Sequence, residues 1–196
     1  MTMTRWIHLK AAVSLLAAVA CAVVPLGTGA RGAESPSFEY QVKAACLYNF
    51  AKFVDWPPAA FPDQKSPIVF GILGEDPFGN VLEGFIKNKT INGRTLTIKR
   101  SRRVEDLKNC QILFISRSEQ ARLAQILTAL KGLNILTVSD TEEFLADGGI
   151  INFKMQGDKV RFEVNLATAQ RAALKISSEL LELAIAVRPP HPEKDS

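Results

Sequence analysis

Short apolar runs alternate with helical patterns through the middle of this chain, and that alternation limits the fold more than any other feature. Residues 68–73, 111–115 and 135–138 are almost wholly apolar, as expected of strands buried on both faces. Residues 95–99 alternate between faces, and helical patterns at 80–87, 103–108 and 118–130 lie between these runs. The pattern predicts an α/β fold, a single three-layer domain with a mostly parallel central sheet and helices on both faces.

The last third of the chain departs from this alternation. Residues 150–153 and 159–165 flank a four-residue polar turn, which predicts an antiparallel hairpin at the C-terminal edge of the sheet. Asn165 is expected to cap a helix that begins at Leu166. We further expect a short helix over 141–145, a last helix over 178–186, and a mobile polar tail over 189–196.

The segment 38–54 is predicted to be the first helix of the folded domain, ending at the Pro57-Pro58 pair. Apolar residues at helical spacing indicate its buried face. They are Val42, Cys46, Phe50, Phe53 and Val54. Gln41, Tyr48, Lys52 and Asp55 form a polar stripe on the other side.

Residues 1–30 are predicted to be a secretory signal peptide and not part of the fold. Arg5 and Lys10 supply the positive start, and a run of 14 apolar residues follows before small residues near position 30. That run is shorter than the roughly 18 residues needed to span a bilayer. A lipoprotein signal acylated at Cys21 is the alternative. We expect a periplasmic domain over 31–188.

Charge and histidine content exclude several classes of function. Removing Arg5 and Lys10 lowers the net charge from +4 to +2, so a general attraction to nucleic acid is not expected. The two histidines are His8 and His191, outside the predicted fold, which leaves no histidine for nucleophile activation or for metal binding. The sequence therefore predicts a protein that is not an enzyme and that holds no catalytic residue, metal or cofactor.

Cys46 and Cys110 remain in the mature chain. An oxidising compartment permits a disulfide between them, and two buried thiols are the alternative.

Polar residues follow the predicted parallel strands and form a candidate ligand-binding site. In an open parallel sheet, ligands bind beyond the carboxyl ends of the strands. The candidates are Gly74, Asp76, Ser116, Arg117, Ser139 and Asp140. Hydroxyls, an Arg and free N–H groups at helix starts suit an anion or a polar small molecule. Ordinary helix capping is the competing explanation.

Two further groups are candidates for binding a partner protein. Tyr48, Lys52 and Trp56 gather polar and aromatic groups near the end of the first helix, and aromatic residues anchor interfaces. A solvated stripe, with Trp56 covering the edge of the core, is the alternative. Arg161 and Glu163 share one face of a late strand, where they form either a surface salt-bridge row or part of a binding site.

Several segments together resemble the YfiR family, in order along nearly the whole mature chain. They are residues 42–57 (VKAACLYNFAKFVDWP), 74–79 (GEDPFG), 110–116 (CQILFIS), 136–140 (LTVSD), 148–153 (GGIINF), 160–165 (VRFEVN) and 180–184 (LLELA). Cys46 departs from the resemblance, because the family motif usually has Phe there. That departure favours core packing for Cys46.

The resemblance implies a periplasmic regulator that binds and restrains an inner-membrane signalling enzyme. In the best-known member this enzyme is a diguanylate cyclase, so cyclic-di-GMP and biofilm-type behaviour are controlled, and an outer-membrane lipoprotein partner relieves the restraint. It also implies a homodimer and a small ligand, a nucleotide or an aromatic amino acid. The alternative function is a small-ligand-binding accessory of a transporter or sensor kinase.

Overall fold

The computed structural model describes residues 37–189. The signal peptide, the acylation alternative at Cys21 and residues 190–196 of the tail lie outside this part of the chain. Seven segments are α-helical or 3-10 helical on the two faces of the sheet: α1 Phe38–Phe53, α2 Val81–Ile86, η2 Val104–Leu107, η3 Arg117–Arg122, α3 Leu123–Leu130, α4 Leu166–Arg171 and α5 Ser178–Leu183. A further 3-10 turn, η1, covers Pro58–Ala60.

An eight-stranded sheet forms the middle layer, in the order β10-β8-β7-β6-β5-β2-β4-β3. Its strands are β2 Ile68–Leu73, β3 Thr90–Ile91, β4 Arg94–Ser101, β5 Ile112–Ile115, β6 Leu136–Ser139, β7 Ile151–Gln156, β8 Lys159–Asn165 and β10 Ala186–Arg188. The five central strands, from β4 to β7, are mutually parallel, and β8 pairs antiparallel with β7. A separate two-stranded sheet joins β1 (Val54–Asp55) to β9 (Lys175–Ile176).

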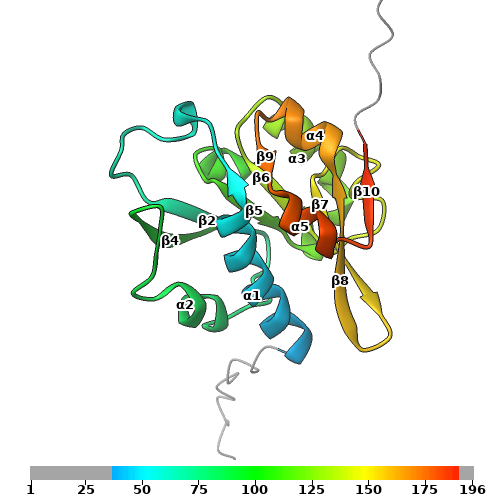
Figure 1. Ribbon diagram of the computed structural model, residues 1–196. Helices are drawn as coiled ribbons and strands as arrows, with labels where there is room; N and C mark the ends of the chain where they lie inside the picture. The colour runs from blue at the N-terminus through cyan, green and yellow to red at the C-terminus, as the bar shows by residue number, and fades with distance from the viewer. Residues whose placement is uncertain (1–36, 190–196) are drawn as a thin grey trace, which may run out of the picture. The chain divides into compact units, whose positions relative to one another are not determined.

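Each face of the sheet has its own hydrophobic core. Residues of α1, α2, α4 and α5 pack on one face around Phe50, Phe114 and Val138. Residues of η2 and α3 pack on the other face with Leu113 and Ile115 of β5. Figure 1 shows α1, α2 and α5 in front of the sheet. The predicted three-layer α/β architecture is therefore confirmed, and it is a single domain.

The hairpin β7–β8 is confirmed as an antiparallel pair, and the structure adds a strand outside it. Residues 178–186 were expected to be one helix, but α5 ends at Leu183 and β10 follows, pairing parallel with β8. The backbone N–H of Ile185 already donates to the Phe162 carbonyl of β8, at 2.9 Å. Residues 185–188 are therefore extended and not helical, because in this conformation their backbone groups form hydrogen bonds with β8.

Two other helices differ from the sequence prediction. The first half of 118–130 is the 3-10 helix η3, which begins where the Ser116 side chain accepts the Ser118 N–H. The predicted helix at 141–145 is wrong, because this segment is a series of turns that places Phe144 and Leu145 in the second core. The cap predicted at Asn165 is confirmed, since its side chain accepts the Thr168 N–H at 3.0 Å.

The predicted buried face of α1 differs from the observed one by about one residue along the helix. Ala44, Leu47, Phe50 and Ala51 are buried, together with Lys43. Val42, Cys46 and Phe53 are only half-buried, whereas Val54 is buried beyond the helix end. The sequence prediction selected the large apolar side chains for the buried face. In the structure α1 packs closely against α2, and small Ala residues allow that close approach.

Candidate functional site

A buried ion cluster joins the start of α1 to the carboxyl end of the parallel strands. Lys43 and Asp140 each expose about 1% of their side chains, and Lys43 Nζ lies 2.5 Å from Asp140 Oδ2. Tyr40 Oη donates to the same carboxylate oxygen at 2.9 Å. Lys43 also pairs with Glu39, one helical turn earlier. Asp140 follows β6 directly, so the sheet fixes its position and α1 brings the lysine to it.

Arg117 completes this ion cluster from the surface side. Its Nε lies 3.2 Å from Asp140 Oδ1, and it follows β5 just as Asp140 follows β6. Two cations thus face the carboxylates of Glu39 and Asp140, so charge is balanced at a place where unbalanced charge would be costly. We call these five residues, Glu39, Tyr40, Lys43, Arg117 and Asp140, the buried ion cluster.

Two members of the cluster, Tyr40 and Arg117, have raised pKa values. Burial and then the negative charge of Asp140 raise the pKa of Tyr40 well above its usual value, so the phenol stays a neutral donor. Burial lowers the pKa of Arg117, but Asp140 and Tyr40 outweigh that effect and the pKa is raised overall. Tyr40 therefore stays a neutral donor and Arg117 a cation, and both contact the carboxylate of Asp140.

The structure brings together two of the six predicted ligand-binding residues. Arg117 and Asp140 are 3.2 Å apart. Asp76 lies elsewhere, where its carboxylate pairs with Arg100 Nε at 2.6 Å. Ser116 caps η3, and Ser139 Oγ donates to the Ile115 carbonyl at 2.7 Å.

The space next to Gly74 is occupied by residues of η3. A Cβ atom on Gly74 would lie 2.4 Å from Ser118 Oγ and 2.8 Å from Glu119 Cγ. Gly74 follows β2, next to β5, at the point where the order of the strands reverses and where open parallel sheets usually bind ligands. The ligand site at these six residues stays a prediction; in the structure each side chain is engaged in capping, pairing or packing.

Lys43 and Tyr40 are the residues that sequence reasoning missed. A lysine and a tyrosine in the first two turns of an amphipathic helix are normally solvated or partly buried. Glu39 four residues before Lys43 is a common surface pair, which offers no sign of burial. The signal that was available is the acidic residue directly after an apolar strand, Asp140, which needs a cation if a helix covers it.

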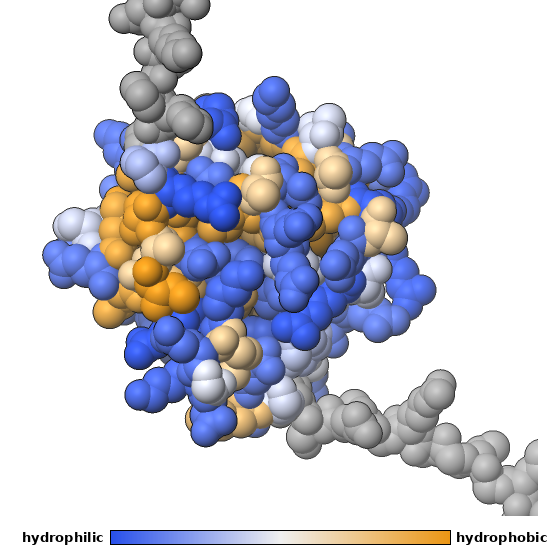
Figure 2. Space-filling view, turned by 90° about the vertical axis from the view of Figure 1, so that its right-hand side faces the viewer, coloured by the Kyte–Doolittle hydropathy of each residue, from blue (hydrophilic) through white to orange (hydrophobic). Residues whose placement is uncertain are grey.

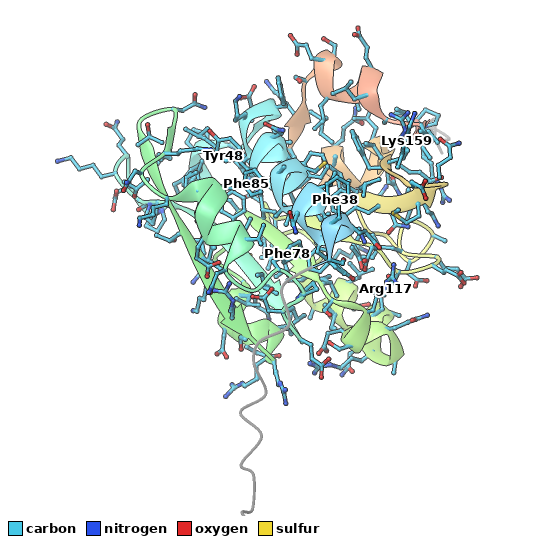
Figure 3. All side chains as sticks on the ribbon, turned by 90° about the horizontal axis from the view of Figure 1, so that it is seen from below. Phe38, Tyr48, Phe78, Phe85, Arg117 and Lys159 are labelled. Carbon is cyan, nitrogen blue, oxygen red and sulfur yellow. The ribbon has the colours of Figure 1, made fainter. Side chains whose placement is uncertain are left out.

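A groove lies beside the start of α1, between this helix and the hairpin β7–β8. It measures about 500 Å³ and is lined by Phe38 and Val42 of α1 and by Met155 and Arg161 of the hairpin, among others. Phe38 is 74% exposed and Met155 45% exposed, which is unusual for large apolar side chains. Figure 3 shows Phe38 at the start of α1, with Lys159 of the hairpin on one side and Tyr48 on the other. Glu39 belongs both to this groove and to the buried ion cluster.

The predicted partner-binding residues lie in separate places. Arg161 lines the groove, and Glu163 lies farther along the same strand, opposite Asn152 of β7. Tyr48 is half-buried, with Lys89 Nζ 4.3 Å and Lys52 Nζ 5.9 Å from the centre of its ring. These residues stay predictions for partner binding.

Trp56 has a structural role in the fold. Its Nε1 donates to the Gln111 carbonyl at 3.1 Å, and the Gln111 side chain in turn donates to Ala60 and accepts from Val69. The indole thus fastens the end of α1 to the start of β5. This contact matches the alternative in which Trp56 covers the edge of the core.

Both cysteines are free, so the disulfide between Cys46 and Cys110 is not formed. Cys46 packs against the core on the α1 face, whereas Cys110 lies in the core on the opposite face. The sheet separates them, which is the physical reason that they cannot pair. Burial raises the pKa of both thiols, that of Cys110 to about 12.

Within residues 37–189, no three His, Cys, Asp or Glu side chains come together as metal ligands. Over the same range no helix has the length and apolar character to cross a bilayer.

Comparison with known proteins identifies the family. The model of the YfiR/HmsC-like family matches residues 40–185, which is most of the chain and nearly all of the described domain. This chain belongs to the YfiR/HmsC-like family. The resemblance seen in the sequence segments is confirmed, and the YfiR/HmsC-like proteins are periplasmic regulators without a catalytic role. None of the curated proteins matches the chain significantly.

A solved structure shows the same fold at low sequence identity. It is a conserved domain protein from Vibrio cholerae O1 biovar eltor strain N16961, with a TM-score of 0.52 and 8% identity. The match covers 76% of this chain but 60% of that protein, so this chain spans only part of its length. At that identity the likeness concerns the fold alone.

Proposed function

We propose that this YfiR/HmsC-like protein binds the periplasmic part of an inner-membrane diguanylate cyclase and holds the enzyme inactive. The observation that carries the proposal is the family match over residues 40–185, which includes most of α1 and every strand of the sheet except β10. A chemical argument supports it. The ionisable groups at the usual ligand-binding edge of the sheet are paired with one another, so binding to another protein accounts for the fold better than catalysis.

The groove beside α1 is the surface that best fits a protein partner. Exposed Phe38 and Met155 offer apolar anchors, and Arg161 adds a cation of the kind enriched in interfaces. The buried ion cluster holds the start of α1 against the sheet, so one wall of the groove is rigid before binding. Restraint of an enzyme requires tighter binding to its inactive form, and a tenfold preference corresponds to about 1.4 kcal/mol.

Two further features belong to the proposal. The mature protein is a homodimer in the periplasm, exported by the signal peptide, and an outer-membrane lipoprotein relieves the restraint. An exposed apolar surface at the edge of the sheet supports self-association: Leu183, Ile185 and Val187 are exposed next to the edge strand β10. Figure 2 shows an apolar area on the left of this face of the molecule.

The test is the level of cyclic-di-GMP in cells. Deletion of the gene should raise it, and the wild-type gene should restore it. Variants Phe38→Ser and Arg161→Glu should fail to restore it, because both side chains are exposed at the groove and their replacement should barely change stability. Lys65→Glu is the matched control for the charge reversal, an exposed lysine in a loop that does not line the groove.

Co-purification of the cyclase from membranes separates the outcomes. We expect loss of binding for Phe38→Ser and Arg161→Glu with unchanged melting temperatures, and binding like wild type for Lys65→Glu. An unchanged cyclic-di-GMP level after deletion would contradict the cyclase as partner and would favour the alternative, an accessory of a transporter or sensor kinase.

A further inference from the structure

A cavity of about 740 Å³ opens near the amino end of β6, away from the buried ion cluster that follows its carboxyl end. It lies between the end of α3, on one face of the sheet, and the end of α4, on the other. Neither the predicted ligand-binding residues nor the groove beside α1 contributes to it. Its volume is in the range that holds small-molecule ligands.

One part of the cavity lining is apolar. Leu127 and Leu130 of α3 line it together with Ile135 and Ile150 from the ends of the neighbouring strands. All four are buried, and they belong to the two hydrophobic cores. The cavity therefore reaches apolar surface from both faces of the sheet, which an apolar ligand body can cover without displacing any hydrogen-bonded group.

The rim carries charged side chains that the protein leaves unpaired. Lys131 follows α3, Arg171 ends α4, and both line the cavity with Asp147. Within residues 37–189 the ion pairs involve none of these three. Arg171 Nη2 donates to Thr168 Oγ1 at 2.8 Å, and Thr168 lines the cavity too, so the guanidinium is held at the rim.

Helix ends supply a competing explanation for the two cations. A cation at the C-terminal end of a helix is stabilised by the helix dipole. Arg171 lies in the last turn of α4, and Lys131 is the C-cap residue of α3. That effect accounts for a cation at each helix end separately. It does not explain why two helices from opposite faces of the sheet place both cations at the same cavity. Asp147 is the one carboxylate in the lining, so the two cations outnumber it.

We propose that this cavity binds a small amphipathic anion. The apolar body lies against Leu127, Leu130 and Ile150, and the anionic group, a carboxylate, phosphate or sulfonate, lies between Lys131 and Arg171. A rim with two cations and one carboxylate has a net charge of +1, which a monoanion neutralises. This inference stands apart from the proposed partner and does not depend on the cyclase.

Three small molecules test which chemical groups the cavity of the purified wild-type protein binds. Octanoate carries an apolar chain and a carboxylate, octyltrimethylammonium carries the same chain with a positive charge, and acetate carries the charge without the chain. Titrations are followed by the amide NMR signals of Gly132 and Gly148, which line the cavity. We expect saturable shifts with octanoate and none with the other two. Equal shifts with octyltrimethylammonium would overturn the role of the cations, and shifts that do not saturate would overturn the site.

Charge-reversal variants separate binding from helix stability. Lys131→Glu and Arg171→Glu should each weaken octanoate binding by about tenfold or more, because each removes a charged partner of the anion. Lys65→Glu is the matched control, an exposed lysine in a loop that lines neither this cavity nor the groove beside α1. If the cations act only on the helix ends, the two variants lower the melting temperature while octanoate binds as before, and the proposal fails.

Discussion

Lys43 is a fully buried lysine in a helix that otherwise buries alanine, leucine and phenylalanine. Its ammonium group is compensated by Asp140 and Glu39, and it also lies 4.4 Å from the centre of the Tyr40 ring. Each of these contacts offsets part of the cost of removing the charge from water. At the scale of single residues, the buried ion cluster is the feature on which the position of α1 depends.

We expect Lys43→Met to lower the free energy of unfolding by about 3 kcal/mol or more, because it leaves Asp140 buried with one cation fewer. Lys52→Met is the matched control, an exposed lysine on the same helix, and should change stability by less than about 0.5 kcal/mol. Urea unfolding of both variants gives the two numbers. Similar small losses for both would show that the ion pair contributes little.

The buried thiol of Cys110 predicts a loss of stability at high pH. Burial raises its pKa in the folded state to about 12, against 9.0 for a free thiol, so the folded protein keeps a proton that the unfolded chain releases. The stabilisation is complete below pH 9 and is lost as the pH rises from 9 towards 12, by up to about 1.4 kcal/mol per pH unit.

Cys110→Ala should flatten this dependence, although it also removes packing and lowers stability at neutral pH. The measurement is the urea midpoint at pH 8, 9 and 10 for both proteins. Tyr40 also has a raised pKa, and its contribution begins near pH 10, so Tyr40→Phe is the appropriate comparison at the upper end. A slope between pH 9 and 10 that is the same with and without Cys110 would refute the assignment.

At the scale of elements, the turns between β6 and β7 replace a helix and pack directly on the second core. Phe144 is fully buried there and lies against the backbone of Gly149. A Cβ atom on Gly149 would come within 2.2 Å of the Phe144 ring, whereas a Cβ atom on Gly84 in α2 would meet no atom within 4 Å. The two glycines therefore have opposite roles in their elements.

Gly149→Ala should destabilise the protein by about 1–3 kcal/mol, because either the ring or the backbone must move. Gly84→Ala should stabilise it by roughly 0.5–1 kcal/mol, since alanine restricts the unfolded chain and favours the helix. Thermal melts of the pair test both signs. A stabilising effect of Gly149→Ala would contradict this, because it would mean that the Phe144 ring can adopt another packed position.

At the scale of the whole molecule, the two cores share one sheet, and the adjacent strands β2 and β5 contribute to both. Phe114 of β5 lies in one core and Leu113 and Ile115 lie in the other. Unfolding of either core therefore exposes one face of strands that the other core also needs. We expect residues 31–196 to unfold in one cooperative transition.

Trp56 makes this prediction easy to measure. The sequence has two tryptophans, Trp6 and Trp56, so Trp56 is the single fluorophore of this kind once residues 1–30 are removed. Its fluorescence reports the junction between α1 and β5, and far-UV circular dichroism reports the whole sheet. Coincident urea transitions are expected. Two separate midpoints would show that α1 and its junction unfold independently.

The sequence by itself determined the layers of this protein, the strands at 68–73 and 159–165, the hairpin, the Asn165 cap and the family. All of these follow from local patterns, because apolar periodicity, turn residues and caps act within about ten residues. Only the tertiary structure decided that Lys43 is buried, that β10 is a strand, and that the two cysteines lie on opposite faces of the sheet. Those outcomes depend on which groups meet across the sheet, about 100 positions apart for Lys43 and Asp140, and no local pattern specifies such pairs. The candidate ligand-binding residues show the same division: the sequence predicted that they follow the parallel strands, and the tertiary structure decided that Asp76 pairs with Arg100 and Arg117 with Asp140.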